Sequence, residues 1–341
     1  MCAPLQRSAC ALALLAASGL AGCGSDAAAV RTVVAVDGSS TVAPLTEAVA
    51  EDFQRAYPGT RVTIGVAGTG GGFRRFCRGD VDVANASRPI TRTETAACAA
   101  AGIRFLEVPV AYDGIVIAVH PSNTWVDALS VDDLRRLWRH EAEGQVLRWS
   151  QVRGSFPDRE MHLFGAGVDS GTFDYFTGVV TGVPRDSRGD YTSSENDNTL
   201  VQGVATDPLA LGYFGFAYFE EHREYLKAVP IVAAPGTTAV PPSRDAIRAG
   251  AYHPLSRPIF VYVNADALAA RADLAAFVDY YAEHAADVAD DVGYVALDAA
   301  ALRAVRVRVA ARTTGSLFGG RQDSASLART LTARLALDPA P

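Results

Sequence analysis

Apolar runs alternate with amphipathic stretches in the first part of the chain. The run 32–36 reads Thr-Val-Val-Ala-Val and breaks at an Asp-Gly pair. The stretch 44–56 places Leu45, Val49 and Phe53 four residues apart, on one face of a helix. Strands are then predicted over 61–66 and 81–84, with a helix over 73–78 between them. This alternation predicts βα units on a largely parallel sheet, and hence an α/β fold.

Two longer apolar runs, 108–119 and 257–263, are predicted to cross between two domains. About 140 residues separate them, which is enough for an inserted domain. We expect a discontinuous first domain (32–112 and 264–320) and a continuous second domain (113–263), with a cleft between them. Two connecting strands form a hinge that lets such a cleft close on a ligand. The remainder, 321–341, is predicted to hold a C-terminal helix and a tail.

The N-terminus has the pattern of an export signal. Arg7 precedes a run of twelve mainly apolar residues, 9–20. Such a run is too short to span a hydrocarbon core of about 30 Å. It ends in Leu20-Ala21-Gly22-Cys23, which resembles the bacterial lipobox.

We therefore expect a signal peptide (1–22), lipid on Cys23 and a short tether (23–31). The protein would then be exported and held at the membrane by its lipid, in the periplasm or on the cell surface. The alternative is a plain signal peptide with an incidental cysteine.

Charge argues against one class of partner. The formal net charge is −7, and loss of residues 1–22 removes Arg7 and makes it −8. Nucleic acids are bound through basic surfaces, so this acidic chain is a poor candidate for that role. An anion would have to be bound by local donors, with arginine as the cation, because Lys227 is the only lysine.

The five cysteines fall into two groups. Cys2 and Cys10 would leave with the signal peptide, and Cys23 would carry lipid. Cys77 and Cys98 remain as a pair, and disulfides persist in exported proteins, so we expect a bridge between them. Two buried thiols are the alternative. The six histidines are scattered, so neither a metal site nor a cofactor is expected.

Three segments place glycine or hydroxyl residues between a strand and a helix start: 38–44, 68–73 and 169–173. A helix N-terminus carries free N–H groups and a partial positive charge. Glycine allows close approach of an anion, and Ser or Thr hydroxyls add donors without charge. Each segment alone is more often a simple helix cap. Together, in an exported two-domain chain, they predict a shared site for a tetrahedral oxyanion.

A fourth segment, Ser87-Arg88-Pro89, follows the strand predicted over 81–84. Arg88 there could clamp two oxygens of the anion, or it could be a surface arginine paired with an acid.

The glycine- and serine-containing loops of this chain do not match the enzyme motifs that they partly resemble. A dinucleotide fingerprint needs a third glycine where Phe73 stands, and no glycine-rich loop ends in Gly-Lys-Ser/Thr. Ser170 lacks the surrounding pattern of a nucleophile elbow. Spacing alone leaves a Ser/His/Asp hydrolase open, but no histidine adjoins a candidate serine in the sequence.

Four strings in order resemble PstS-type phosphate-binding proteins, the receptors of the phosphate ABC transporter. They are GSSTV (38–42), GTGGGF (68–73), VDVANASRPI (81–90) and DSGTFDYF (169–176). The branch with the cyanobacterial SphX proteins is the most similar, since it also shows stretches like 194–200, 210–214 and 254–258. The resemblance runs from about residue 33 to 320. It implies the type II periplasmic-binding-protein fold, with two α/β domains around a phosphate cleft, and a monomeric partner for a membrane permease.

The resemblance also implies roles for single residues. Thr41 and the N–H of Val42, with Ser40 in the same turn, would hold one oxygen of phosphate. Thr69 or the N–H of Gly70 would hold another. The anion would be capped from the second domain by Ser170, Gly171 and Thr172.

One departure affects selectivity. Better-studied members carry an aspartate at the position of Ser87, which accepts the proton of monohydrogen phosphate, and an arginine where this chain has Ala166. Arg88 would then supply the charge. We expect Asp169 to be the proton acceptor, ahead of Asp113 and the pair Glu195 and Asp197.

Four functions follow from these patterns. A phosphate receptor ranks first, and a receptor for sulfate or molybdate on the same fold ranks second. A secreted phosphatase or esterase using Ser170 and an adhesive or sensory lipoprotein are the remaining hypotheses.

Overall fold

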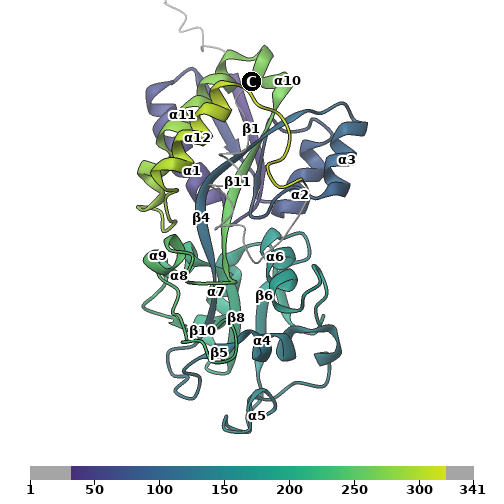
Figure 1. The fold of residues 1–341 in the computed structure, drawn as a ribbon, viewed down its shortest axis with the longest axis vertical. Coiled ribbons are helices and arrows are strands. Elements are labelled where there is room, and N and C mark those ends of the chain that lie inside the picture. The colour runs from purple at the N-terminus through teal and green to yellow at the C-terminus, as the bar shows by residue number, and fades with distance from the viewer. Residues whose placement is uncertain (1–31, 320–341) are drawn as a thin grey trace, which may run out of the picture. The chain divides into compact units, whose positions relative to one another are not determined.

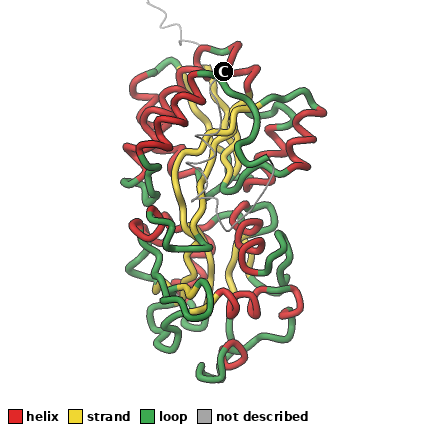
Figure 2. The backbone as a smooth tube through the Cα atoms, in the orientation of Figure 1, coloured by secondary structure: helices red, strands yellow, loops and turns green. Residues whose placement is uncertain are grey.

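The computed structural model describes residues 32–319. The predicted signal peptide, the lipidation site Cys23 and the C-terminal helix therefore lie outside the described residues. Within 32–319, helices cover a mixed sheet of nine strands, and Figures 1 and 2 show this layered arrangement. The α/β fold class is confirmed. No helix in this range is both long and apolar enough to cross a membrane.

The first part of the sheet is built from parallel strands joined by helices. β1 (Thr32–Gly38) lies between β2 (Thr60–Ile64) and β3 (Val83–Ala86). The helix that joins β1 to β2 is α1 (Ala43–Ala56), and its predicted apolar face of Leu45, Val49 and Phe53 is fully buried. The apolar face that the 3.6-residue period of the sequence predicts is thus the face that α1 packs against the core.

The next helix, α2 (Gly68–Phe76), begins five residues before the predicted start at 73. The glycine run forms its first turns because the helix lies directly on the backbone of β1. A Cβ on Gly72 would come within 2.5 Å of the Cα of Gly38, a distance that no side chain tolerates. Glycine there serves close packing of helix on strand.

Two long strands connect the two parts of the sheet. β4 (Phe105–Val119) is buried along its whole length, and its first part pairs antiparallel with β11 (Ser256–Asn264). The second part of β4 pairs with β8 (Ala210–Gly215). Figure 1 shows β4 and β11 side by side along this path. These strands contain the two predicted crossings, while the domain boundaries stay a prediction.

The second part of the sheet continues from β8 to β6 (His162–Ala166) and β7 (Thr192–Ser194), which run parallel to one another. The full strand order is β2-β1-β3-β11-β4-β8-β6-β7, with β9 (Lys227–Ala228) also paired to β4. The helices in this part are α4 (Val131–Trp138), α5 (Trp149–Val152), α6 (Gly171–Val180), α7 (Asp197–Thr206), α8 (Phe216–Glu221) and α9 (Arg244–Arg248), with a 3₁₀ turn at His140–Ala142. A separate two-stranded sheet pairs β5 (Leu129–Ser130) with β10 (Ile231–Val232).

After β11 the chain returns to the first part of the sheet. It forms α10 (Ala265–Ala270), α11 (Ala272–Ala289) and α12 (Ala299–Ala310). Between α11 and α12, Val295 forms an isolated antiparallel bridge with Tyr112 of β4. Residues after β11 therefore pack with the first part of the sheet through this bridge.

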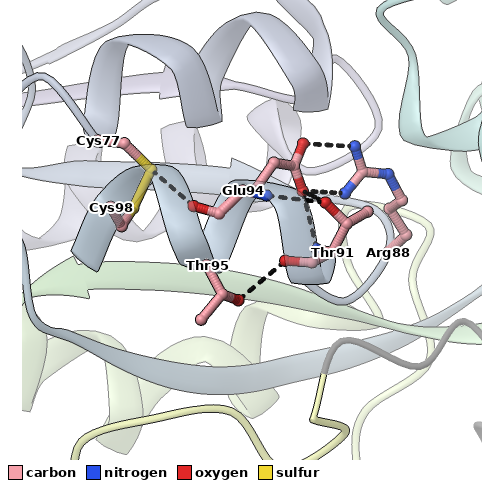
Figure 3. Close-up of a disulfide and its surroundings, with 6 residues drawn as sticks. All are labelled: Cys77, Arg88, Thr91, Glu94, Thr95 and Cys98. Atoms are coloured by element: carbon pink, nitrogen blue, oxygen red, sulfur yellow. Dashed lines mark hydrogen bonds and ion pairs between the residues drawn. A yellow bond between two sulfur atoms is a disulfide. The ribbon is translucent and has the colours of Figure 1, made fainter. Parts of the chain in front are cut away.

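A disulfide joins Cys77, at the end of α2, to Cys98 in α3 (Arg92–Ala100), as predicted (Figure 3). The α3 helix begins with a capping box, in which Thr91 and Glu94 satisfy each other's backbone N–H groups. The bridge and the cap fix both ends of the segment between α2 and α3.

We expect the double variant Cys77→Ser/Cys98→Ser to lose about 3 kcal/mol of unfolding free energy, because the bridge closes a loop of 21 residues. Urea unfolding with and without a thiol reductant measures this. The reductant should lower the stability of the wild-type protein and leave the variant unchanged. Equal stability of both proteins without reductant would contradict the prediction.

Candidate functional site

The turn between β1 and α1 is held in place by the rest of the protein. Tyr218 donates its hydroxyl proton to the carbonyl of Ser40 at 2.9 Å, and Tyr294 donates to the carbonyl of Thr41. The N–H of Val42 donates back to Ser39 at 3.2 Å. The N–H of Val42, a predicted donor, thus has a partner within the turn, and the predicted side chains of Ser40 and Thr41 are both buried.

Helix α2 and strand β3 contribute a second pair of hydroxyls. The Oγ1 of Thr69 lies 3.2 Å from the Oγ of Ser87 and accepts a hydrogen bond from the backbone N–H of Ser87. Both side chains are fully buried. The N–H of Gly70 donates to the carbonyl of Asp169 at 2.9 Å, so this predicted donor already has a protein partner.

The N-terminus of α6 meets both of these groups. Its N-cap is Ser170, whose Oγ accepts from the N–H of Thr172 at 3.1 Å. The hydroxyl of Thr172 lies 3.1 Å from that of Thr41. A Cβ on Gly171 would lie only 2.5 Å from Thr69 Oγ1 and 2.6 Å from Ser87 Oγ, so glycine lets α6 come this close.

The structure thus brings the predicted segments near 41, 69, 87 and 171 into one buried cluster, which we call the hydroxyl cluster. It consists of the hydroxyls of Thr41, Thr69, Ser87 and Thr172, together with Gly171, which packs against them. Hydroxyls at this spacing can rotate their protons toward a common acceptor. Their role in holding an anion stays a prediction.

The cation of the cluster is Arg257 of β11. Its Nη2 donates to Thr172 Oγ1 at 2.7 Å, and its Nη1 donates to the carbonyl of Gly171 at 3.3 Å. The guanidinium is also 3.1 Å from the carboxylate of Asp113 on β4, and neither side chain is exposed. Arg257 therefore supplies a buried positive charge directly beside the hydroxyls.

The sequence did not predict Arg257 as a residue of the site, although the segment 254–258 that contains it contributes to the family resemblance. The signal that could have found it is an arginine inside an otherwise apolar, fully buried strand. An unpaired charge in such a place costs several kcal/mol, so its presence indicates a partner and a purpose.

Arg88 is held by carboxylates of two helices. Its Nη groups donate to both oxygens of Glu94 at 2.8 Å, and its Nε donates to Asp174 of α6 at 2.6 Å. Figure 3 shows Glu94 reaching Arg88 from the capping box of α3. The guanidinium is thus engaged by carboxylates from two helices, and its predicted clamp on an anion stays a prediction.

Asp169, the predicted proton acceptor, pairs with an arginine of α2. Both of its oxygens accept from Arg74 of α2, at 2.9 and 2.7 Å, and its side chain is 34% exposed. Arg74 lowers the pKa of this carboxyl below its usual value. The pair links α2 to the loop before α6, and the role of Asp169 as proton acceptor stays a prediction.

Two other acids lie in the interior. Burial raises the pKa of Asp113, and Arg257 opposes that shift. Burial, with repulsion from Asp113, raises the pKa of Asp197 to about 7. Within 32–319, no group of three histidine, cysteine or carboxylate side chains could hold a metal ion.

The amino-acid sequence of the chain is similar to those of known proteins. The family model of the PBP superfamily domain matches residues 24–284. Protein SphX of Synechococcus elongatus is 44% identical over 87% of this chain and 87% of its own length. The phosphate-binding protein PstS of Staphylococcus haemolyticus is 34% identical over 76% and 79% of the two chains.

A solved structure is similar to this chain in both fold and sequence. The crystal structure of a possible phosphate binding protein from Planctomyces limnophilus superposes with a TM-score of 0.61 at 42% identity, covering 82% of this chain and 98% of that one.

We expect Arg257→Met to lower the unfolding free energy by about 3–5 kcal/mol, because it leaves the buried carboxylate of Asp113 without its cation. Replacing both residues, as Arg257→Met/Asp113→Leu, should recover much of that loss. The control Arg74→Met breaks the exposed pair with Asp169 and should cost about 1 kcal/mol or less. Urea unfolding of the three variants measures the differences, and equal losses for Arg257→Met and Arg74→Met would contradict the buried pairing.

Proposed function

The chain belongs to the PBP superfamily and, within it, to the phosphate-binding proteins of the PstS and SphX type, and on this premise we propose that it captures inorganic phosphate outside the cytoplasm and delivers it to the membrane permease of an ABC transporter.

One observation supports the choice of ligand: the hydroxyl cluster and Arg257 form a buried set of donors drawn from separate segments of the chain. A tetrahedral oxyanion presents acceptors in several directions and carries negative charge, so it suits such a set. Each hydrogen bond to a charged group contributes roughly 1.5–3 kcal/mol, and a few of them hold an anion tightly even after desolvation.

The rival functions have less support. Ser170 caps α6 through the N–H of Thr172, which is the role of an N-cap serine and not that of an activated nucleophile. The relatives are named as binding proteins, so we propose that this chain is a receptor and not an enzyme. A sulfate or molybdate receptor remains the second candidate, because the donors themselves do not distinguish oxyanions.

We further propose that β4 and β11 act as the hinge between the two predicted domains, which close on the ligand. A monomer suffices, because one chain supplies every donor of the cluster. Lipid on Cys23 would hold the receptor at the membrane, and the support for this is the sequence Leu20-Ala21-Gly22-Cys23.

The variant Thr172→Val should raise the Kd for phosphate about 10- to 100-fold, because it removes the hydroxyl that joins Thr41 to Arg257. Isothermal titration of the purified protein with phosphate measures this. The matched control is Thr177→Val, on the same helix, whose hydroxyl instead donates to the carbonyl of Phe173. Its Kd should stay within about threefold of the wild type.

Phosphate that fails to bind the wild-type protein, while sulfate or molybdate binds tightly, would overturn the choice of ligand. Equal effects of the two threonine variants would overturn the choice of site.

Lipidation has its own test. Cells that produce the full chain should incorporate labelled fatty acid into it, and Cys23→Ser should abolish the label and release the protein from the membrane fraction. Cys10→Ser, inside the predicted signal peptide, should change neither. Label that persists in Cys23→Ser would rule out Cys23 as the anchor.

A further inference from the structure

Four charged side chains form a continuous series of ion pairs, which we call the ion-pair chain: Glu94, Arg88, Asp174 and Arg185. Both Nη groups of Arg88 donate to Glu94 at 2.8 Å, and its Nε donates to Oδ2 of Asp174 at 2.6 Å. The other oxygen of Asp174 accepts from Nη1 of Arg185 at 3.0 Å. Figure 3 shows the Glu94 end of the chain. Two carboxylates and two guanidiniums balance one another, so the chain needs no ligand charge to form.

The ion-pair chain crosses from one part of the sheet to the other. Arg88 follows β3, and Glu94 lies in the first turn of α3, so both belong to the first part. Asp174 lies in the first turn of α6, which follows β6 in the second part, and Arg185 lies in the loop after α6. Of the contacts within the chain, the one between Arg88 and Asp174 therefore joins the two parts.

This crossing contact is the most deeply buried of the series. The side chains of Arg88 and Asp174 are 3% and 5% exposed, whereas that of Arg185 is 54% exposed. The guanidinium of Arg88 also lies 5.5 Å from the centre of the Phe73 ring on α2. Attraction between opposite charges is stronger and less screened by salt in such an interior. The contact therefore favours the arrangement in which α6 lies against the first part.

Each charge of the crossing contact has a second partner on its own side. If the two parts separate at β4 and β11, Arg88 keeps Glu94 and Asp174 keeps Arg185. A charge left without any partner would make separation costly. The second partners remove most of that cost. This arrangement suits a contact that forms and breaks repeatedly.

We propose that the ion-pair chain is a reversible latch that sets how long the ligand stays bound, with Asp174 as the positioning residue that holds α6 against the first part. The inference rests on the proposed function and adds to it the residues that govern release. The ligand leaves when the two parts separate, and separation breaks the contact between Arg88 and Asp174. The fraction of closed molecules also scales the apparent affinity for the ligand.

The two ends of the second half of the chain should act in opposite directions. Loss of the Asp174 carboxylate removes the crossing contact and favours the open arrangement. Loss of the Arg185 guanidinium leaves Asp174 with Arg88 as its one cation of the chain, and that cation is within reach only when the parts are closed. The change therefore destabilises the open arrangement more than the closed one. A purely structural role would instead weaken binding in both cases.

The test is the rate at which the purified protein, loaded with radiolabelled phosphate, releases it into an excess of unlabelled phosphate. We expect Asp174→Asn to speed release about tenfold and to leave the association rate within about threefold of wild type, because loss of a buried charge partner acts mainly on dissociation. Arg185→Asn should slow release about threefold by favouring the closed arrangement. Asparagine suits this position because Arg185 has a φ of 71°, which asparagine tolerates.

The matched control is Asp190→Asn. Asp190 also pairs with an arginine, Arg188, but both lie in the second part of the chain. Its loss should change neither rate more than about twofold, because no contact between the two parts is removed. Equal acceleration of release by Asp190→Asn and Asp174→Asn would contradict the latch.

The remaining outcomes also decide the matter. Release from Asp174→Asn at the wild-type rate or slower would overturn the inference, and so would faster release from Arg185→Asn; both leave phosphate capture standing. If Asp174→Asn does not fold, the exposed Arg185→Asn decides alone: slower release supports the latch, and unchanged or faster release contradicts it. Absence of phosphate binding in the wild type would refute the proposed function and the inference with it.

Discussion

The buried pairing of Arg257 with Asp113 is the interaction on which the rest of the site depends. A guanidinium with no exposure to water is stable only beside a carboxylate. Asp113 satisfies that need from the neighbouring strand, and the pair can form because β4 and β11 run antiparallel with Asp113 opposite Arg257. Register in the two longest strands thus places a positive charge at the hydroxyl cluster. The remaining N–H groups of Arg257 then reach the first turn of α6.

A second set of contacts holds α6 against α2 and β3. The N–H of Gly70 and the guanidinium of Arg74 both bind Asp169, and Arg88 binds Asp174. The Arg88 contact also ties α6 to Glu94 and so to the helix that the disulfide fixes. These contacts hold the segments of the site against one another. Arg88, which the sequence predicted as an anion donor, in this way links α6 to the start of α3.

The sequence predicted the α/β class, the crossing strands, the disulfide and the three donor turns, because each follows from local period, turn residues or compartment. It did not predict which arginine faces the site. Arg88 stands in a quoted motif beside candidate donors, but its direction is set by Glu94 and Asp174, which only the folded chain brings to it.

The most direct test of the central claim is anomalous diffraction from crystals of the protein grown with arsenate, a tetrahedral anion with the shape and charge of phosphate. The account predicts a single strong arsenic peak beside the hydrogen-bonding groups Arg257 Nη2, Thr172 Oγ1 and Thr41 Oγ1. A peak beside Arg88 instead, or none between α1 and α6, would contradict it.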